Sequence, residues 1–180
     1  MIEIKVILIS GKSNSGKGSV AKLFEEMYKN QGKHVIRCSL STYIRDIAKK
    51  DFYWDGVDTL ASRKFMAEVY RIGTEFYPYH MMRRVWERDI EPFVTKNSIV
   101  IVESFREKVN YDYCKMLQDK GKIDKITTIR VVRPNFNVLQ DEEMEHHVSE
   151  SDLDDFKFDI IVENSGTLDD LYQRIMIGEI

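Results

Sequence analysis

Residues 2–20 of the chain read IEIKVILISGKSNSGKGSV, and this stretch decides the fold. Its first part, residues 2–9, is a short apolar run rich in β-branched side chains, which is typical of a buried strand. The next element is expected to be a helix over residues 17–29, because apolar side chains recur there at helical spacing. The segment between them carries two glycines, Gly11 and Gly16. The stretch therefore predicts a strand, a glycine-bearing loop and a helix in direct succession.

The loop between this strand and this helix, GKSNSGK, fits the pattern G-x-x-x-x-G-K. Its glycines allow the main chain to curl, so that several N–H groups converge on a polyphosphate. The helix behind the loop directs its positive N-terminal end at the same anion, and Lys17 adds a point charge for the β- and γ-phosphates. A turn that only links strand to helix is the alternative interpretation. The residues predicted to hold the nucleotide are Gly11, Lys12, Ser13, Asn14, Ser15, Gly16, Lys17, Gly18 and Ser19.

The rest of the chain continues the alternation of strands and helices. Further strands are expected over residues 34–38, 98–102, 125–132 and 159–162, and further helices over residues 42–50, 59–76, 79–90, 106–119 and 167–177. Such alternation is typical of α/β proteins with a parallel sheet. A chain of 180 residues suits one domain. We therefore expect a single domain, residues 1–180, built as a three-layer α/β sandwich with a five-stranded parallel sheet of the P-loop NTPase kind.

The composition excludes several classes of protein. Hydrophobic residues make up 43% of the chain and charged residues 32%, which describes a globular protein and not a disordered one. The formal net charge of −3 excludes an overall basic surface for nucleic acid or an anionic membrane, although it allows a local cationic cleft. No stretch approaches the roughly 20 apolar residues that span a bilayer. Cys38 and Cys114 lack metal-ligand spacing, which favours a reducing, cytoplasmic location. A monomer and a homodimer both stay open.

The residue after Lys17 is Gly18, so the hydroxyl that usually binds Mg²⁺ at this position is absent, and Ser19 follows it. The resulting Gly-Lys-Gly-Ser resembles the Gly-Lys-Gly-Thr ending of the loop in adenylate and cytidylate kinases. The resemblance implies that the Ser19 hydroxyl contacts phosphate and that the magnesium keeps more water. A GTPase would also need an Asn-Lys-x-Asp segment, which this sequence lacks.

Several further segments make the chain similar to the deoxynucleoside monophosphate kinase family, whose relatives include the animal-type phosphomevalonate kinases. These segments are residues 39–49, 71–75, 102–106, 133–134, 147–153 and 159–168, and they are spread over most of the chain. The His-x-Ser-Glu segment from His147 and the Asn-x-Gly-Thr-Leu segment from Asn164 carry the sharper signal. The resemblance implies a fold like that of nucleoside monophosphate kinases. It also implies an acceptor-binding helical region at about residues 40–92, a short lid at about residues 134–152, and ATP and Mg²⁺ as cofactors.

Arginines supply most of the other candidate site residues, because a guanidinium pairs with phosphate through two parallel hydrogen bonds. The resemblance assigns Arg45, Arg71, Arg83, Arg106 and Glu103 to the acceptor, and it adds Arg130 and Asn164 to the nucleotide side. Lys17, Arg106 and Arg133 are expected to act on the transferring phosphoryl group, with Arg133 reaching it from the lid.

The magnesium site is expected to use Ser19 and Glu103. The family usually has an Asp where this chain has Ser104, and Glu103 precedes it. Successive residues of a strand point to opposite faces of the sheet, so only one of these two side chains can face the metal. The sequence leaves open which of them does so.

The charge of the acceptor separates the candidate reactions. A phosphomonoester is largely dianionic at pH 7, because its second pKa is about 6, and its oxygen can attack a γ-phosphate without a general base. An alcohol would need a carboxylate base, for which Glu103 is the only obvious candidate. We therefore favour a kinase that transfers the γ-phosphoryl group of ATP to a nucleoside or deoxynucleoside monophosphate, giving the diphosphate. Its partners are then small nucleotides, and neither nucleic acid nor a membrane.

Two alternatives stay open. One is a kinase of the same fold that accepts phosphomevalonate or dephospho-coenzyme A. The other is a regulatory protein that binds nucleotide without turning it over, which the unusual pair Glu103 and Ser104 favours.

Overall fold

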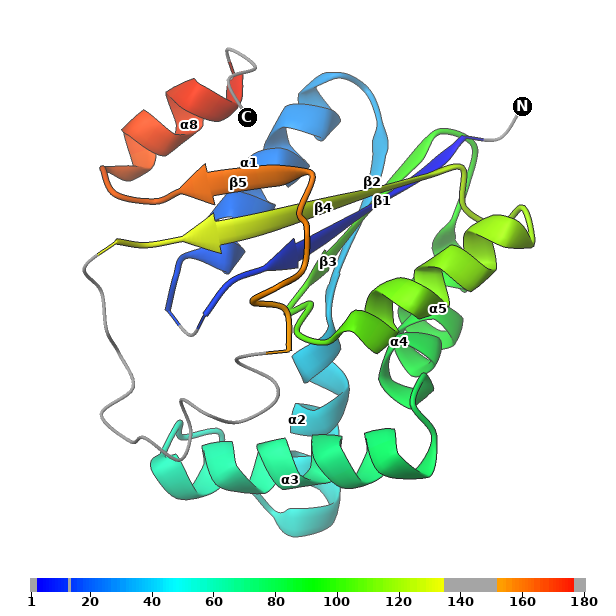
Figure 1. Ribbon diagram of the computed structural model, residues 1–180, viewed down its shortest axis with the longest axis vertical. Coiled ribbons are helices and arrows are strands. Elements are labelled where there is room, and N and C mark those ends of the chain that lie inside the picture. The colour runs from blue at the N-terminus through cyan, green and yellow to red at the C-terminus, as the bar shows by residue number, and fades with distance from the viewer. Residues whose placement is uncertain (1–2, 13, 135–151, 177–180) are drawn as a thin grey trace.

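The computed structural model describes residues 3–12, 14–134 and 152–176. Five strands form one sheet in the order β2-β3-β1-β4-β5, and every neighbouring pair is parallel (Figure 1). The strands are β1 (Ile4–Ser10), β2 (His34–Ser39), β3 (Ser98–Glu103), β4 (Lys125–Val132) and β5 (Ile160–Glu163). The prediction of an α/β fold with a five-stranded parallel sheet is confirmed.

The central strands are apolar because both of their faces are covered. In β3, the four side chains from Ile99 to Val102 are at most 7% exposed. The strand pairs with β1 on one side, with Val100 opposite Val6, and with β2 on the other. An uninterrupted hydrophobic run is the pattern that a strand buried between two helical layers requires.

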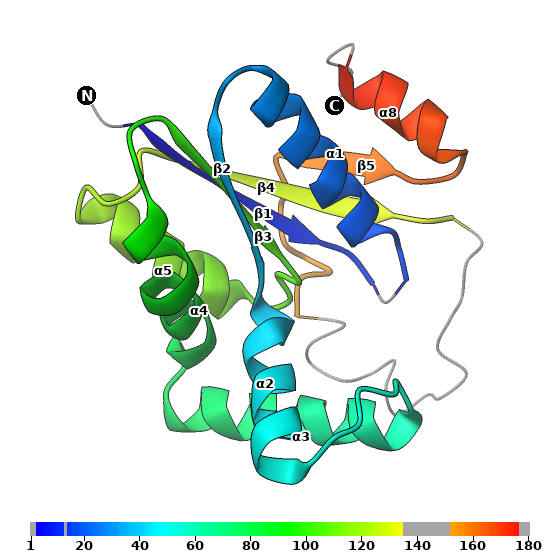
Figure 2. The ribbon, with the colours of Figure 1, turned by 180° about the vertical axis from the view of Figure 1, so that it is seen from behind.

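Two helical layers cover the sheet (Figures 1 and 2). Helices α1 (Lys17–Asn30) and α8 (Leu168–Met176) pack on one face, against Ile7 and Ile9 of β1. The other face carries α4 (His80–Val85) and α5 (Lys108–Asp119), which pack against Val6 and Leu8. The alternation of side chains along β1 therefore divides the core into two clusters, one on each face of the sheet.

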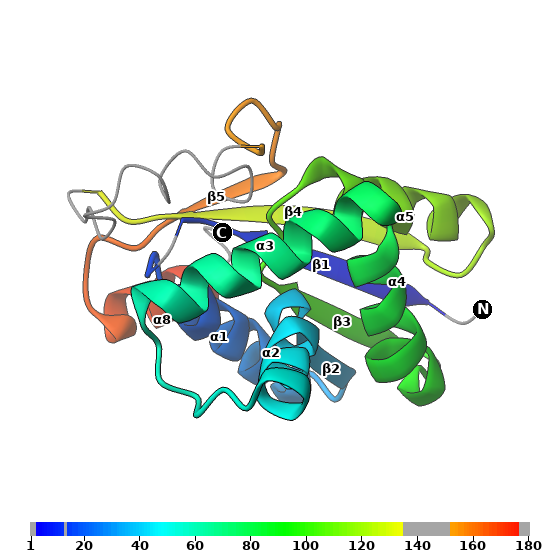
Figure 3. The ribbon, with the colours of Figure 1, turned by 90° about the horizontal axis from the view of Figure 1, so that it is seen from below.

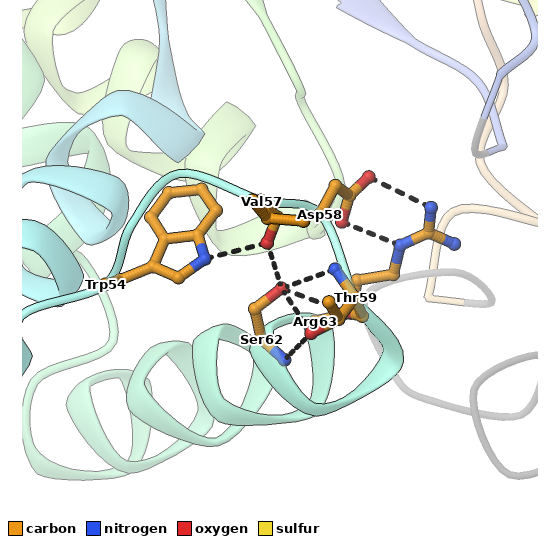
Figure 4. A network of polar contacts seen from close by, with 6 residues as sticks. All are labelled: Trp54, Val57, Asp58, Thr59, Ser62 and Arg63. Carbon is orange, nitrogen blue, oxygen red and sulfur yellow. Dashed lines mark hydrogen bonds and ion pairs between the residues drawn. The ribbon is translucent and has the colours of Figure 1, made fainter.

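Helices α2 (Leu40–Phe52) and α3 (Leu60–Phe76) lie beyond the edge at which the strands end. Figure 3 shows α3 crossing in front of the sheet when the molecule is seen from this end. The start of α3 is fixed by a capping box: the Thr59 side chain accepts a hydrogen bond from the Ser62 N–H at 3.1 Å, and the Ser62 hydroxyl accepts one from the Thr59 N–H at 2.9 Å (Figure 4). Next to it, Arg63 pairs with Asp58.

Several predicted elements differ from the observed ones by one or two residues at their ends, and at two places the difference has a structural cause. The expected helix over residues 79–90 is divided into α4, a π-helical turn η1 (Trp86–Ile90) and a 3₁₀ turn η2 (Glu91–Phe93). Pro92 lacks an N–H group, so a regular α-helix cannot pass through it without losing a hydrogen bond. The helix expected from residue 106 begins at Lys108 instead. Ser104 has a left-handed φ of 62°, which turns the chain out of β3 before the helix starts.

No helix in the described parts of the chain is both long and apolar enough to cross a membrane. The predicted lid, residues 134–152, lies outside the described residues except for its two ends.

Candidate active site

The loop over residues 11–16 connects the carboxyl end of β1 to the first residue of α1, as predicted. From β1 the chain crosses over one face of the sheet to β2, at the sheet edge. From β3 it crosses over the opposite face to β4, on the other side of β1. The connection that leaves β1 and the connection that leaves β3 therefore run in opposite directions across the sheet. Open α/β sheets bind their ligands at the carboxyl ends of the strands at such a point.

The backbone of the loop has a shape that only glycine permits at two positions. Gly11 and Gly16 have φ values of +148° and +97°, and a Cβ on Gly16 would lie 2.2 Å from Nδ2 of Asn164. That amide donates a hydrogen bond to the Ser15 carbonyl at 2.9 Å, so the loop after β5 braces the loop after β1. Ser15 is 4% exposed, and its Oγ has no hydrogen-bond partner among the residues that the structure describes. Ser13 lies outside the described residues.

Lys17 stands at the start of α1 with its ammonium turned back over the loop. Its Nζ donates to the carbonyls of Gly11 and Lys12, at 2.6 Å each. Burial, which is the largest cause, and the charges of Arg106 and Arg130 together lower the pKa of Lys17 to about 7, although Glu103 acts in the opposite direction. The fold therefore brings Glu103 of β3, Arg130 of β4 and Arg106 of the loop after β3 within electrostatic reach of Lys17 at the start of α1.

The side chains of Glu103 and Ser104 point in different directions. Oε2 of Glu103 lies 3.5 Å from the place that a Cβ on Gly18 would take, so Glu103 faces the phosphate loop. The Ser104 hydroxyl faces Ser39 instead, 3.1 Å from its Oγ. Burial raises the pKa of Glu103, and the adjacent Arg37 counteracts that rise.

Arg106 and Arg45 are two predicted site residues that interact electrostatically. Arg106 lies in the loop between β3 and α5, and Arg45 lies on an exposed face of α2. Burial lowers the pKa of Arg106, the hydroxyl of Tyr70 raises it, and the charge of Arg45 lowers it. The charge of Arg45 is therefore close enough to Arg106 to act on its pKa.

Arg71 and Arg83 are not brought into this group. Arg71 is exposed on α3 and pairs with Glu68 at 3.0 Å and with Glu75 at 2.5 Å. Arg83 is exposed on α4, pairs with Glu87 at 2.7 Å and lies over the Tyr77 ring. Each arginine has a glutamate four residues later on the same helix face, which is the spacing of a surface ion pair.

Arg130 and Arg133 lie at the end of β4 and just after it. Arg130 pairs with Asp154 at 2.7 Å, and its guanidinium lies over the ring of Phe158 at 5.5 Å from the centroid. Arg133 is exposed and leads into residues 135–151, outside the described residues. Its predicted role in the lid therefore stays a prediction.

The residues present fit a magnesium ion. Mg²⁺ takes oxygen ligands and is usually held by one or two carboxylates together with substrate phosphates and water. Glu103 supplies a carboxylate oxygen beside Gly18, and Ser19 supplies a hydroxyl in the first turn of α1. Among the described residues, no group of three His, Cys, Asp or Glu side chains could hold a metal ion without such phosphates.

Comparisons with known proteins agree with this fold. No protein-family model matches the sequence, and no curated protein matches it either. Among solved structures, the chain is similar to an APS kinase of Mycobacterium tuberculosis in complex with AMPPNP and APS. The two share 18% identity with a TM-score of 0.53 over 98% of both chains. It is also similar to a thymidylate kinase from Ehrlichia chaffeensis, with 15% identity and a TM-score of 0.52 over 99% of this chain and 100% of that one. The chain therefore has the fold of the P-loop kinases.

Proposed function

We propose that the protein is a kinase that transfers the γ-phosphoryl group of ATP to a nucleoside or deoxynucleoside monophosphate. The observation that carries this proposal is the convergence of Lys17, Glu103, Arg106 and Arg130 on the loop at the end of β1. Placing three cations, Lys17, Arg106 and Arg130, in one partly buried region is unfavourable because they repel one another, and a loop that only linked β1 to α1 would not require it. An anion with several charges offsets that repulsion.

The loop supports the donor half of the proposal. The unpartnered Oγ of buried Ser15 and the ammonium of Lys17 are polar groups that a polyphosphate would satisfy. Lys17 now donates to two carbonyls of its own loop, and a bound phosphate would replace them as acceptors. Asn164 would keep the loop in shape through its hydrogen bond to Ser15.

Arg106 and Arg45 support the acceptor half. Two guanidinium groups near one another suit a dianionic phosphomonoester, whose oxygen attacks without a general base. Glu103, the candidate base for an alcohol acceptor, is instead paired with Arg37 and faces Gly18. This arrangement favours a role at the metal over a role as base.

The residues would then divide the work of positioning and neutralisation. Bound through Ser19 and Glu103, Mg²⁺ would neutralise charge on the phosphates of ATP. Lys17 would stabilise the negative charge that develops on the transferring phosphoryl group, and Arg106 would hold the acceptor phosphate in line with that group. Arg130 would add charge from β4, and Arg133 is placed by its sequence position to act from the lid.

The proposal is tested with the purified protein, MgATP at saturation and a coupled assay that detects ADP formation. Each ribonucleoside and deoxyribonucleoside monophosphate is offered in turn, and Lys17→Ala is the negative control. Turnover with at least one of them, lost in the Lys17→Ala variant, is the expected result. ATP binding without turnover of any nucleotide would contradict the proposed acceptor.

A second acceptor class follows from one comparison. The similar Mycobacterium tuberculosis structure is an APS kinase in complex with APS, so the same assay should include APS. Phosphomevalonate and dephospho-coenzyme A belong in the panel as the other acceptors that the sequence leaves open. Turnover with one of these alone would keep the donor site and replace the acceptor.

A further inference from the structure

Arg37 joins three elements around the candidate site, although no sequence motif marks it. It lies on β2, on the sheet face that α1 covers. Its Nε is 3.0 Å from Oε1 of Glu103, and its Nη1 donates to Oε2 of Glu25, on α1, at 2.8 Å. The three side chains are between 18% and 33% exposed, so the ion pairs are only partly screened by water.

The pairing gives the Glu103 carboxylate a defined direction. One oxygen, Oε1, is held by Arg37, and the other, Oε2, lies beside Gly18 at the start of α1. Lys17 is the residue next to Gly18, and Glu103 is close enough to raise the pKa of its ammonium. Even so, the Lys17 ammonium donates to the carbonyls of Gly11 and Lys12.

A partly buried carboxylate near an ammonium forms an ion pair with it unless another cation holds the carboxylate. Lys17 bound to Glu103 would have fewer donors for a nucleotide phosphate. A guanidinium can prevent this, because its planar fork binds a carboxylate in a fixed direction, whereas an ammonium is a point charge on a flexible stem. Glu25 in turn fixes the direction of the guanidinium.

We propose that Arg37 is a positioning residue, which holds the Glu103 carboxylate beside Gly18 and off the Lys17 ammonium so that this ammonium stays available to a nucleotide. The inference rests on the nucleotide binding that the proposed function assigns to the loop. It requires no step of phosphoryl transfer, so its test measures binding alone.

The test measures the dissociation constant of a fluorescent N-methylanthraniloyl ADP by anisotropy, in EDTA, so that no metal contributes. Arg37→Gln is expected to weaken binding on the order of tenfold, because the freed carboxylate competes for Lys17. Adding Glu103→Gln to Arg37→Gln is expected to restore the affinity of the Glu103→Gln single variant. Arg37→Met removes the same charge from a chain of similar length and repeats the comparison if Arg37→Gln does not fold.

Arg63→Gln is the matched control. Arg63 is exposed to the same degree as Arg37, 35% against 33%, and it also pairs with a carboxylate, that of Asp58. Its loss is expected to leave the dissociation constant unchanged. Wild-type affinity in both Arg37→Gln and Arg37→Met, or a double variant that binds as weakly as Arg37→Gln, would overturn the proposal. A wild-type protein that does not bind ADP at all would overturn the proposed function as well.

Discussion

Replacing Gly16 by alanine tests the brace between the two loops at the end of the sheet. Gly16 precedes α1 with a φ of +97°, a conformation that L side chains rarely adopt. A Cβ there would meet Nδ2 of Asn164 at 2.2 Å, and this is the atom that donates to the Ser15 carbonyl. The alanine variant can therefore fold as the wild type does only if the Asn164 side chain moves away.

Two terms set the size of the effect. Holding a non-glycine residue in the left-handed region costs roughly 1–2 kcal/mol. Loss of the hydrogen bond from Asn164 to Ser15 removes about 1 kcal/mol. Gly16→Ala should therefore lower the free energy of unfolding by about 2–3 kcal/mol, whereas Asn164→Ala, which loses the hydrogen bond alone, should lower it by about 1 kcal/mol.

A double-mutant cycle separates the brace from the backbone strain. The hydrogen bond can be lost only once, so the double variant Gly16→Ala/Asn164→Ala should be about as stable as Gly16→Ala alone. The two single effects should exceed the double effect by about 1 kcal/mol. Urea unfolding followed by circular dichroism measures all four proteins. Additive effects, or an effect of Gly16→Ala below about 0.5 kcal/mol, would refute the argument that Asn164 braces the loop.

Three further perturbations probe charge in and near the site. Lys17→Ala is expected to lower kcat/KM on the order of a thousandfold, because a charge contact to the transferring group is lost; steady-state kinetics with the best acceptor measure this, and a loss below tenfold would contradict the role. Because the pKa of Lys17 is lowered to about 7, the Lys17 ammonium of the free protein loses its proton as the pH rises above 7, and nucleotide binding at pH 8.5 should be accompanied by the uptake of about one proton. Calorimetry in buffers of different ionisation enthalpy measures this uptake, and zero uptake would contradict a charged Lys17 in the complex. Burial, and after it the charge of Asp152, raise the pKa of Glu107 to about 7, above its unfolded value, so the free energy of unfolding of the wild type falls as the pH rises through 7. In urea unfolding, the stability of Glu107→Gln relative to the wild type should therefore increase by about 1–2 kcal/mol between pH 5.5 and pH 8.5. A difference that stays constant with pH would show that Glu107 does not titrate in this range.

The parts of the fold that could be predicted are those in which one short segment carries its own signal. Strand β4 lies where the β-branched run predicts it, over Lys125–Val132, and helix α1 begins at Lys17 as the loop pattern requires. The π-helical turn over Trp86–Ile90 gives no such signal, because a periodicity of 3.6 residues continues through it unchanged. The sequence therefore predicts that a helix is present there but not its local form.

The site was predictable where the residues belong to a motif and not where they meet through the fold. Arg37 is one polar residue of an edge strand, and its partners Glu25 and Glu103 come from two other elements. No local pattern relates the three. Conversely, the surface pairing of Arg71 and Arg83 could have been expected, because Glu75 and Glu87 stand at the i+4 positions.

The end of β3 and the start of α1 fit each other at one point in the site. The position after Lys17 is Gly18, which has no side chain, and the last residue of β3 is Glu103. Oε2 of Glu103 lies at van der Waals distance, 3.5 Å, from the place where a Cβ on Gly18 would be. A side chain at residue 18 would therefore start in contact with the Glu103 carboxylate. The absent side chain of Gly18 provides the space beside the Glu103 carboxylate, and Arg37 holds the carboxylate in the direction of that space.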